Sequence, residues 1–428
     1  MTPAARVACA IEILDAVVTN KGPADRVVSD EMRRRRFMGS KDRHAVADQV
    51  FRVLRHRSRY DWWLKTARMP LTCRGWVVAD MAAYDPDMIR GVFSGVRFGP
   101  RPLSPHEQRL IEAIDLHGLE PKEMPRKVLL EMPDWAVEPM QASLGDRIDE
   151  ELAAMLRSAP MDLRVNTLVT DRDAAAAALA EEGLTTKATP LSPLGLRMFQ
   201  RKPLGQIKAF REGMIEVQDE GSQILAALVD AEPGMHVVDM CAGAGGKALA
   251  IAAQMENKGR ITALDIHEIK VERARERFRR AGVQNTRARI VEGTRDRWYK
   301  RHTDEFDRVL VDAPCSGTGT WRRNPDARWG RGGIDLEELT DLQARLLHRA
   351  ASIVKPGGRL IYGTCSLMNL ENEDQVTKFV AEHPEFSVMP VKDVLSQEIE
   401  GCEEFLKLTP AQHNTDGFFG AVLVRKDG

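Results

Sequence analysis

Short apolar strands alternate with helical segments from residue 236 onward, and this alternation restricts the fold more than any other feature. The clearest strands cover residues 236–239, 260–265, 309–312 and 360–363. Each is nearly all apolar at its centre, as expected of strands that are buried on both faces. The pattern predicts a doubly wound, mostly parallel α/β domain over residues 231–428, with a plausible edge strand at 417–424.

The chain before this domain has two regions with other sequence patterns. Apolar residues recur at helical spacing in the first part, as at Val7, Ile11 and Leu14, so we predict an all-helical domain over residues 1–125. Four prolines between residues 121 and 139 favour a connection. Over residues 126–230 we expect this linker and a small α+β module, with a strand at 163–167, a helix at 171–182, and short strands and turns at 183–199.

Composition excludes several classes of protein. Hydrophobic residues make up 43% of the 428 residues and charged residues 29%, an ordinary composition for a globular protein. No run approaches the ~18 apolar residues of a membrane span, and the N-terminus carries no apolar signal core. The six cysteines form neither a CxxC pair nor a Cys/His metal pattern. We expect a cytoplasmic protein with reduced thiols, no metal and no membrane partner; the sequence identifies no protein partner.

The net charge of −1 conceals two basic stretches. Residues 21–74 contain fifteen Lys and Arg against six Asp and Glu, including the run Arg33 to Arg36 and the cluster Arg52, Arg55, Arg57 and Arg59. A second stretch covers residues 270–301. Such runs are usually solvated faces, but two in one chain, with Tyr60, Trp62 and Trp63 beside the first, indicate a polyanionic partner.

A glycine-rich turn follows the first strand of the α/β domain. The segment from Asp239 to Lys247 contains Gly243, Gly245 and Gly246, and Asp265 ends the next strand, where a carboxylate can accept ribose hydroxyls. The combination indicates a nucleoside-bearing cofactor, either a dinucleotide or S-adenosylmethionine. We favour S-adenosylmethionine because the glycines do not follow G-x-G-x-x-G and a carboxylate at 239 would oppose a pyrophosphate. The alternative is a tight turn that binds nothing, with Asp239 capping the helix.

Two strand ends carry a cysteine. Cys315 lies in the segment 312–317 and Cys365 in 363–366, at the sheet edge where such folds bind ligands. Isolated free cysteines are mostly small buried hydrophobes, but a pair there favours covalent chemistry on an electrophilic carbon. A thiolate that adds to carbon 6 of a pyrimidine makes carbon 5 nucleophilic enough to take a methyl group. Asp312 is placed to hold a proton on N3 of cytosine, and Lys247 to supply positive charge.

These motifs resemble those of the RsmB/Nol1/Nop2/Sun family of RNA cytosine-5 methyltransferases. The resemblance covers most of the chain and is carried by residues 239–247, 312–317 with the basic segment after them, and 364–366 followed by 371–373, with further segments at 163–168, 218–223 and 415–419. The helical N-terminus is similar to the NusB-like RNA-binding domain of the bacterial small-subunit rRNA enzyme of this family.

The resemblance implies roles that the residues alone leave open. Cys365 would be the nucleophile and Cys315 would assist product release. The residues alone do not show which of the two cysteines has which role. The S-adenosylmethionine pocket would be lined by Cys241, Ala242, Gly243, Ala244, Gly245, Gly246, Lys247, Asp265, Glu292 and Asp312. RNA would contact Arg33, Arg34, Arg35, Arg36, Arg164, Arg322, Arg323 and Asn324, and we expect Trp321 and Trp329 to touch the substrate.

The expected reaction is methylation of cytosine carbon 5 in RNA, with 16S ribosomal RNA or a small-subunit precursor as the partner. The alternatives are the same chemistry on transfer RNA or 23S rRNA, and a non-catalytic RNA-binding ribosome-assembly factor. The chain departs from the family pattern at Ala244, where a proline is usual, at Ala248, where a threonine is usual, and at Glu292, where an aspartate is usual. The first two should loosen the turn without removing a ligand atom.

Overall fold

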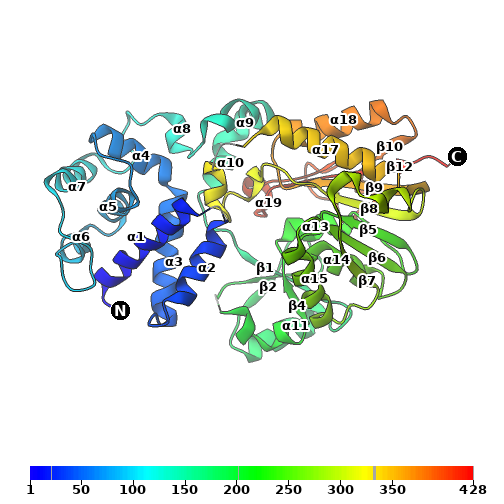
Figure 1. The fold of residues 1–428 in the computed structure, drawn as a ribbon, viewed down its shortest axis with the longest axis horizontal. Helices are drawn as coiled ribbons and strands as arrows, with labels where there is room; N and C mark the ends of the chain where they lie inside the picture. The colour runs from blue at the N-terminus through cyan, green and yellow to red at the C-terminus, as the bar shows by residue number, and fades with distance from the viewer. Residues whose placement is uncertain (21, 201, 331–333, 428) are drawn as a thin grey trace. The chain divides into compact units, whose positions relative to one another are not determined.

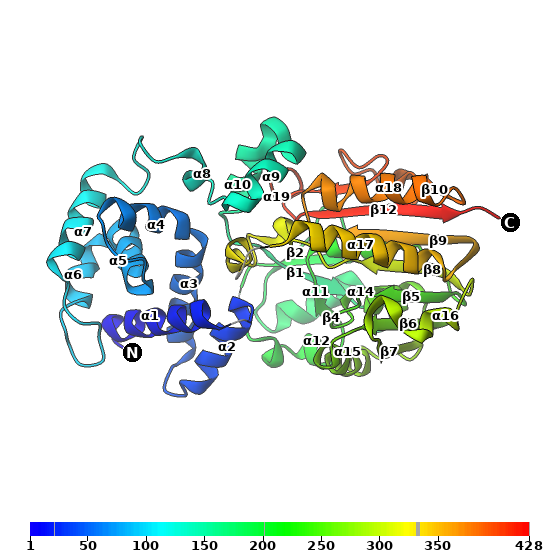
Figure 2. The same cartoon turned by 45° about the horizontal axis from the view of Figure 1, so that its top comes forward.

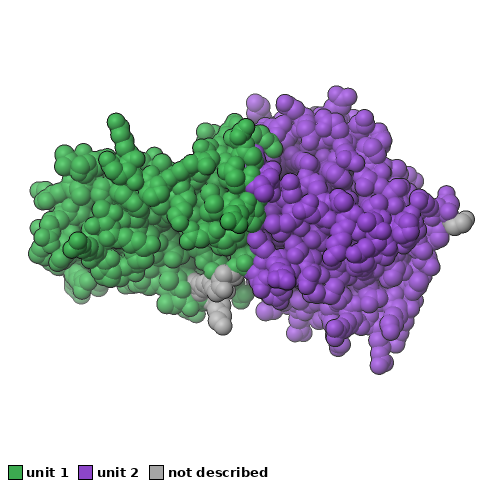
Figure 3. Space-filling model, turned by 90° about the horizontal axis from the view of Figure 1, so that it is seen from above, with its two compact units in different colours: residues 1–141, 145–157, 321–334 green, residues 142–144, 158–320, 335–428 purple. Residues whose placement is uncertain are grey.

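The computed structural model describes residues 1–428 except 21, 201, 331–333 and 428 (Figure 1). Lys21, which begins the first basic stretch, therefore lies outside the described residues. The chain forms two compact units, which Figure 3 colours green and purple. Unit 1 comprises residues 1–141, 145–157 and 321–334, and unit 2 comprises residues 142–144, 158–320 and 335–428. This grouping differs from our division along the chain. Residues 126–141, 145–157 and 321–334 join the N-terminal helices, and the small α+β module shares unit 2 with the α/β domain.

Unit 1 is built from helices, as the periodicity predicts. They are α1 (Pro3–Thr19), α2 (Ala24–Arg34), α3 (Ser40–Arg55), α4 (Arg57–Thr66), α5 (Cys73–Tyr84), α6 (Pro86–Val92), α7 (Pro105–His117), α8 (Arg126–Leu129), α9 (Val137–Leu144), whose last residues belong to unit 2, and α10 (Ile148–Ala154). Local signals fix several starts. Thr2 caps α1, and Ser104 and Glu107 form a reciprocal capping box at α7. Of the predicted apolar residues of α1, Val7 and Leu14 are buried and Ile11 is half-buried, whereas Val18, at the same spacing, is exposed.

Several side chains between Trp321 and Trp329 pack into the interior of unit 1. Trp321 is wholly buried, and its ring meets the Trp135 ring edge-on, with 5.9 Å between centroids. The buried Arg328 guanidinium donates hydrogen bonds to the carbonyls of Glu131 (3.2 Å) and Met155 (3.3 Å). Trp329 donates its indole N–H to the Leu54 carbonyl at 3.4 Å. The expected substrate contact of Trp321 is therefore wrong, because core packing occupies the whole side chain.

The first part of unit 2 is the predicted small α+β module. It contains β1 (Met161–Val165), α11 (Arg172–Glu181), β2 (Thr186–Ala188), β3 (Gly195–Met198), α12 (Lys208–Arg211) and β4 (Ile215–Val217). Its strands form an antiparallel sheet in the order β2-β3-β1-β4. Leu163 and Val165 alternate with polar residues along β1 and pack with Leu179 of α11 and Ile215 of β4. This alternation leaves the opposite face of β1 and β4 to polar side chains.

The second part of unit 2 is the predicted mostly parallel sheet with its helices. The elements are α13 (Glu220–Ala227), β5 (His236–Met240), α14 (Gly246–Gln254), β6 (Arg260–Asp265), α15 (Glu268–Arg280), β7 (Thr286–Ile290), α16 (Arg297–Lys300), β8 (Phe306–Asp312), α17 (Leu336–Ala351), β9 (Val354–Thr364), α18 (Glu373–Glu382), β10 (Phe386–Met389), β11 (Leu406–Leu408), α19 (Pro410–His413) and β12 (Phe418–Arg425). The strand order is β10-β12-β9-β8-β5-β6-β7, and β11 also pairs with β12.

The final strand occupies a different place from the one expected. β12 lies inside the sheet, antiparallel to both β9 and β10, and is not an edge strand. Its residues Phe418 to Leu423 are all buried, which agrees with an interior position. The five strands from β9 to β7 are mutually parallel, so their carboxyl ends lie along one edge.

Helices lie on both faces of this sheet (Figure 2). An apolar core lies between each face and its helices. Val237 faces α13, α14 and α15, whereas its neighbour Val238 faces α16, α17 and α18. Successive residues of a strand therefore pack into the cores on opposite faces of the sheet. For this reason each strand is continuously apolar in sequence. The strand order reverses beside β5, where β8 takes the place next to it. Sheets of this type bind ligands beyond the carboxyl ends of the strands at such a reversal.

No helix within the described residues is long and apolar enough to cross a lipid bilayer.

We expect Trp321→Ala to destabilise unit 1 by about 3–5 kcal/mol, since it removes a large side chain from a core position. Urea unfolding followed by circular dichroism, with limited proteolysis to locate the loosened region, measures the change. Leu116→Ala is the control, because Leu116 is 78% exposed and its truncation should cost less than about 0.5 kcal/mol. Equal midpoints for both variants would contradict the burial of Trp321.

Candidate active site

The glycine turn after β5 has a backbone that requires its glycines. Cys241, Gly243 and Gly245 have φ angles of 60°, 57° and 77°, in the left-handed region. A Cβ on Gly245 would lie 2.6 Å from the ring of Phe278 on α15. Asp265, at the end of β6, accepts hydrogen bonds from the N–H groups of Gly243 (2.9 Å) and His267 (2.8 Å). The turn and the acidic strand end predicted from sequence are therefore in direct contact.

A cavity of about 380 Å³ opens where the turn meets the carboxyl ends of the strands. Its lining includes Cys241, Gly243, Leu264, Asp265, Ile266, His267, Lys270, Val291, Gly293, Thr294, Tyr299, Asp312, Ala313, Pro314, Leu342 and Leu346. Ala242, Ala244, Gly245, Gly246 and Lys247 belong to the turn but not to this lining. Glu292 is exposed, so the residues on either side of it line the cavity while its own side chain does not.

Asp239 is a wholly buried carboxyl group at the end of β5. Neither of its oxygens has a hydrogen bond of good geometry. Burial, reinforced by the Asp312 carboxylate, raises the pKa of Asp239 to about 8. A buried acid without a donor is costly unless a ligand supplies one. The cavity, with Asp265 in its lining, fits the nucleoside part of S-adenosylmethionine. Asp239 is not in that lining, but it ends β5 directly before the turn.

Lys247 and Asp312 form an ion pair across the site. Lys247 lies in the first turn of α14, and its Nζ is 2.7 Å from Oδ2 of Asp312 at the end of β8. The ammonium also lies 5.5 Å from the centroid of the Phe418 ring. Burial alone would lower the pKa of Lys247, but Asp312 and, more weakly, Asp239 and Cys365 outweigh burial and raise it. The site therefore keeps a permanent positive charge beside Asp312.

The two predicted cysteines come together at neighbouring strand ends. Asp312 of β8 lies opposite Gly363 of β9 in the parallel register, so the loops that follow start side by side. The sulfur atoms of Cys315 and Cys365 are 3.4 Å apart. The hydrogen bond with Cys365, followed by burial, raises the pKa of the Cys315 thiol well above its ordinary value. Cys315 therefore resists ionisation.

Glu371 ties the two cysteine loops together, a role that sequence reasoning missed. It is wholly buried and accepts hydrogen bonds from the Ser316 N–H (2.8 Å), the Ser316 hydroxyl and the Gln343 side-chain amide (3.0 Å). The Gly319 N–H donates to the Cys365 carbonyl at 2.9 Å, which joins the same loops directly. The signal in the sequence was Glu371 itself, which follows Cys365 closely in the family segment 371–373. The segment resembled a family motif but did not show that Glu371 would bind Ser316.

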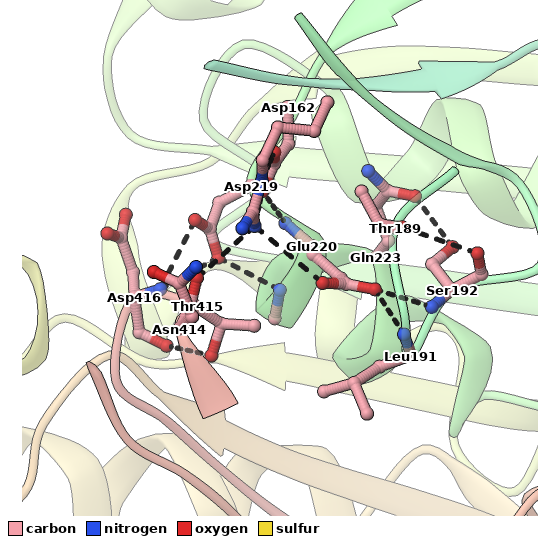
Figure 4. A network of polar contacts seen from close by, with 12 residues as sticks. Asp162, Thr189, Leu191, Ser192, Asp219, Glu220, Gln223, Asn414, Thr415 and Asp416 are labelled. Carbon is pink, nitrogen blue, oxygen red and sulfur yellow. Dashed lines mark hydrogen bonds and ion pairs between the residues drawn. The ribbon is translucent and has the colours of Figure 1, made fainter. Parts of the chain in front are cut away.

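A second network fastens the segment 218–223 to the segment 414–416 (Figure 4). Asp219 accepts the N–H of Asp416 at 3.2 Å with both oxygens. Arg197 bridges Asp162 (2.7 and 2.9 Å) and the carbonyl of Asn414 (3.2 Å). Glu220 accepts the N–H groups of residues 191 and 192. This network fixes the start of β12, and with it the Phe418 ring beside Lys247.

The residues assigned to RNA divide by burial. Arg33, Arg34 and Arg36 are exposed, and Arg35 is half-buried in ion pairs with Glu31 and Glu12. Arg323 and Asn324 are half-buried, whereas Arg322 is only 3% exposed. Arg164 is also 3% exposed and binds the protein's own backbone. We therefore leave Arg164 and Arg322 out of the candidate RNA surface, because the fold has enclosed their side chains.

The cluster from Arg52 to Arg59 likewise serves the helical core. Arg52 pairs with Asp80 at 2.6 Å and Arg59 with the wholly buried Glu131 at 2.8 Å. Tyr60 and Trp63 are buried in the same core, so they offer no stacking surface. Exposed cations of the first basic stretch remain at the end of α2 and just after it, at Arg33, Arg34 and Arg36. Others lie elsewhere in the stretch, at Arg26, Lys41, Lys65 and Arg68.

Comparison with known proteins gives a consistent result. Residues 226–424 match the family described as 16S rRNA methyltransferase RsmB/F, and residues 132–204 match the ferredoxin-like domain of RsmF/B-like methyltransferases. A probable ribosomal RNA small subunit methyltransferase B of Synechocystis is 36% identical over 68% of this chain and 66% of its own length. The ribosomal RNA small subunit methyltransferase B of Shewanella oneidensis is 32% identical over 68% of this chain and 67% of its own. The alignments thus span about two thirds of these relatives.

Solved structures share the fold. The crystal structure of PH0851 is 25% identical and covers 99% of both chains with a TM-score of 0.81. A methyltransferase homolog protein from Pyrococcus horikoshii is 28% identical and covers 70% of this chain and 97% of its own, with a TM-score of 0.60. The helical N-terminal region, the antiparallel module and the mostly parallel sheet are therefore an established combination, and the predicted fold class is confirmed.

We expect Asp239→Asn to raise the melting temperature of the free protein at pH 8. The carboxyl titrates near 3.8 in an unfolded chain and near 8 in the fold. Between these values the unfolded chain releases a proton that the folded protein keeps, so wild-type stability falls as pH rises. The advantage of the variant should therefore shrink toward pH 4 in a series of thermal unfolding curves.

Asp307→Asn is the opposite-sign control. Lys355 and the His236 N–H outweigh burial at Asp307 and lower its pKa, so this variant should lose stability at pH 8. A lower melting temperature for Asp239→Asn at pH 8 would show that the carboxylate already has a stabilising partner.

Proposed function

We propose, from the premise that the chain belongs to the RsmB/F family of 16S rRNA methyltransferases, that it methylates carbon 5 of a cytosine in RNA. The observation that carries the proposal is the pair of thiols 3.4 Å apart, beside the cavity that Asp312 lines. The names of the aligned relatives support 16S rRNA as the RNA. A non-catalytic assembly factor would have no need of two cysteines, Asp312 and Lys247 at one place.

S-adenosylmethionine, the cofactor of this family, supplies a methyl group on a sulfonium centre when bound. In this chain Asp265 would accept the ribose hydroxyls, and Asp239 lies where a carboxylate attracts the positively charged amino-acid part. Residues 241–247 would enclose the same part with backbone N–H groups at the start of α14. Glu292 stays outside this set because its side chain is exposed to solvent.

We assign the attack on carbon 6 to Cys365. Cys315 holds its proton more strongly than an ordinary thiol, which makes it the weaker nucleophile of the two positions. Cys365 lies in the segment that resembles the family's second cysteine motif, and that resemblance implies the nucleophile. The new sulfur–carbon bond makes carbon 5 an enamine carbon, which can form a bond to the methyl group. Asp312 would share with N3 of the base a proton taken up from solvent, so that the ring carries less negative charge during the addition.

Completion of the reaction requires loss of the carbon 5 proton and cleavage of the bond between Cys365 and carbon 6. Cys315 is the neighbouring group, and we assign it to this release, as the base or through collapse of the adduct. Glu371 acts through the backbone of the Cys315 loop, since it bonds Ser316 and keeps the two thiols at one place. It is a positioning residue and not a catalytic one.

The exposed Arg33, Arg34 and Arg36, at the end of α2 and just after it, supply charge for phosphate contacts. Arg323 and Asn324 belong to the basic segment that follows the first cysteine motif along the chain, which makes them further candidates for RNA contact. Recognition of a single base requires that it leave the stack, so we expect an unpaired cytosine as the target.

Cys365→Ala should abolish methyl transfer, and Cys315→Ala should leave the protein attached to its RNA. The first variant lacks the nucleophile, whereas the second forms the adduct but cannot release it. Denaturing gel electrophoresis after incubation with RNA and S-adenosylmethionine detects the adduct. Cys402→Ala is the control, since it removes a buried thiol that follows neither of the two strand ends. An adduct in Cys365→Ala and none in Cys315→Ala would reverse the two roles.

Deletion of the gene should remove 5-methylcytosine from one position of 16S rRNA. Bisulfite sequencing of total RNA from the deletion strain and its parent measures the loss, and reintroduction of the wild-type gene, but not of Cys365→Ala, should restore it. Loss from a transfer RNA or from 23S rRNA would reassign the substrate. If no cytosine changes, the proposed enzymatic activity is wrong.

A further inference from the structure

We propose that Arg164, Glu216 and Arg277 form a clamp through which the small antiparallel module holds the glycine turn in the shape that binds the cofactor. The three are positioning residues for S-adenosylmethionine. The inference rests on the proposed function, since it concerns the same cofactor site. It adds a second task to a module expected only to bind RNA.

The module reaches the turn through two residues that lie opposite each other in its sheet. Arg164 of β1 and Glu216 of β4 are partners in the antiparallel register, so their side chains project from the same face. Leu163 and Val165 face the module's own core on the other side. The polar pair therefore leaves the module and enters the methyltransferase part of unit 2.

Arg164 makes the direct contact. Its guanidinium donates to the carbonyl of Gly246 at 2.8 Å and to the side-chain oxygen of Gln218. Burial lowers the pKa of Arg164 to about 10, and its Nε has no hydrogen-bond partner. An enclosed guanidinium that bonds only neutral groups is expensive, and an apolar residue of similar size would fill the same space at less cost. Its use here is best explained by the carbonyl it holds.

Glu216 makes the indirect contact through α15. Its Oε2 accepts hydrogen bonds from Nε and Nη2 of Arg277 at 3.3 and 3.0 Å, while Nη1 of Arg277 donates to the carbonyl of Ala244 at 2.9 Å. Glu216 also binds Arg280, one helical turn further along α15, but Arg280 stacks on Phe210 and has no bond to the turn. Arg277 and Arg280 thus share the carboxylate of Glu216, and only Arg277 also bonds to the turn.

The held carbonyls lie on either side of Gly245, the residue with φ of 77°. Fixing the peptides at 244 and 246 fixes the conformation between them. The turn has alanine at 244, where the family usually has a proline that would stiffen the chain. The clamp supplies restraint from outside at that same residue. Lys247 follows directly, so the clamp also sets the start of the helix that carries the ammonium to Asp312.

Arg277→Gln and Arg280→Gln are matched variants that separate positioning from general stability. Both remove an ion pair with Glu216, so both should lower the melting temperature, but only the first releases the Ala244 carbonyl. Calorimetric titration with S-adenosylmethionine alone should give a dissociation constant about tenfold higher for Arg277→Gln and nearly unchanged for Arg280→Gln. With RNA present, KM for the cofactor should rise while kcat at saturation stays within about twofold.

Hydrogen exchange of the cofactor-free protein gives a readout that does not depend on binding. Amides of residues 241–248 should exchange faster in Arg277→Gln than in wild type and Arg280→Gln. Arg164→Met, which retains the volume, should reproduce the Arg277→Gln pattern. Arg277→Lys retains the charge, and its exchange rates should lie between those of wild type and Arg277→Gln, because one ammonium cannot keep the forked geometry. If Arg277→Gln does not fold, Arg277→Lys replaces it in both measurements.

Equal cofactor affinity in Arg277→Gln and Arg280→Gln, or unchanged exchange over residues 241–248, would overturn the clamp. Failure of the wild-type protein to bind S-adenosylmethionine would instead overturn the proposed function. Loss of binding in Arg277→Gln with wild-type binding intact supports the clamp whichever RNA proves to be the substrate.

Discussion

The parallel pairing of β8 with β9 is the contact on which the site depends. It sets Asp312 opposite Gly363, and the Ala313 N–H continues the ladder with a 2.8 Å bond to the Gly363 carbonyl. Both cysteine loops therefore leave the sheet at the same level, with their sulfur atoms within reach of one substrate carbon. A shift of one residue in this register would turn Asp312 to the other face and separate the loops. The apolar residues of both strands, which serve two cores at once, prevent that shift.

Much of this arrangement could be predicted from the sequence because its signals are local. Apolar strand centres, glycines in a turn and a cysteine three residues past a strand are visible without knowledge of neighbours. The interior place of β12 could not be predicted in this way, since β12 pairs with β9, a strand more than fifty residues away in the chain. Charge misled most: arginine usually indicates a surface, yet Arg164, Arg322 and Arg328 are enclosed by the fold. Glu371 was seen as part of a motif, but its partner Ser316 lies on the other cysteine loop.

The buried charged side chains near the site have similar surroundings and contacts. Asp239, Glu216, Glu371 and Arg164 are all less than a tenth exposed. Three of them bond backbone groups of the turn or of a cysteine loop, Glu216 through Arg277, so they fix the path of the chain where the sheet ends. Asp239 alone has no hydrogen bond of good geometry. Most of these buried polar contacts therefore shape the backbone of the site.

The segment 321–334 gives the chain an unusual constraint on its ancestry. Between the first cysteine and the second, the polypeptide supplies Trp321 and Arg328 to the interior of the helical unit before it returns to the sheet. Recombination that exchanged only the N-terminal helices would leave those two side chains without their matching cavity. The helical unit and this short insertion must therefore be inherited together, although a gene would carry them far apart. A change in one is expected to be answered by a compensating change in the other.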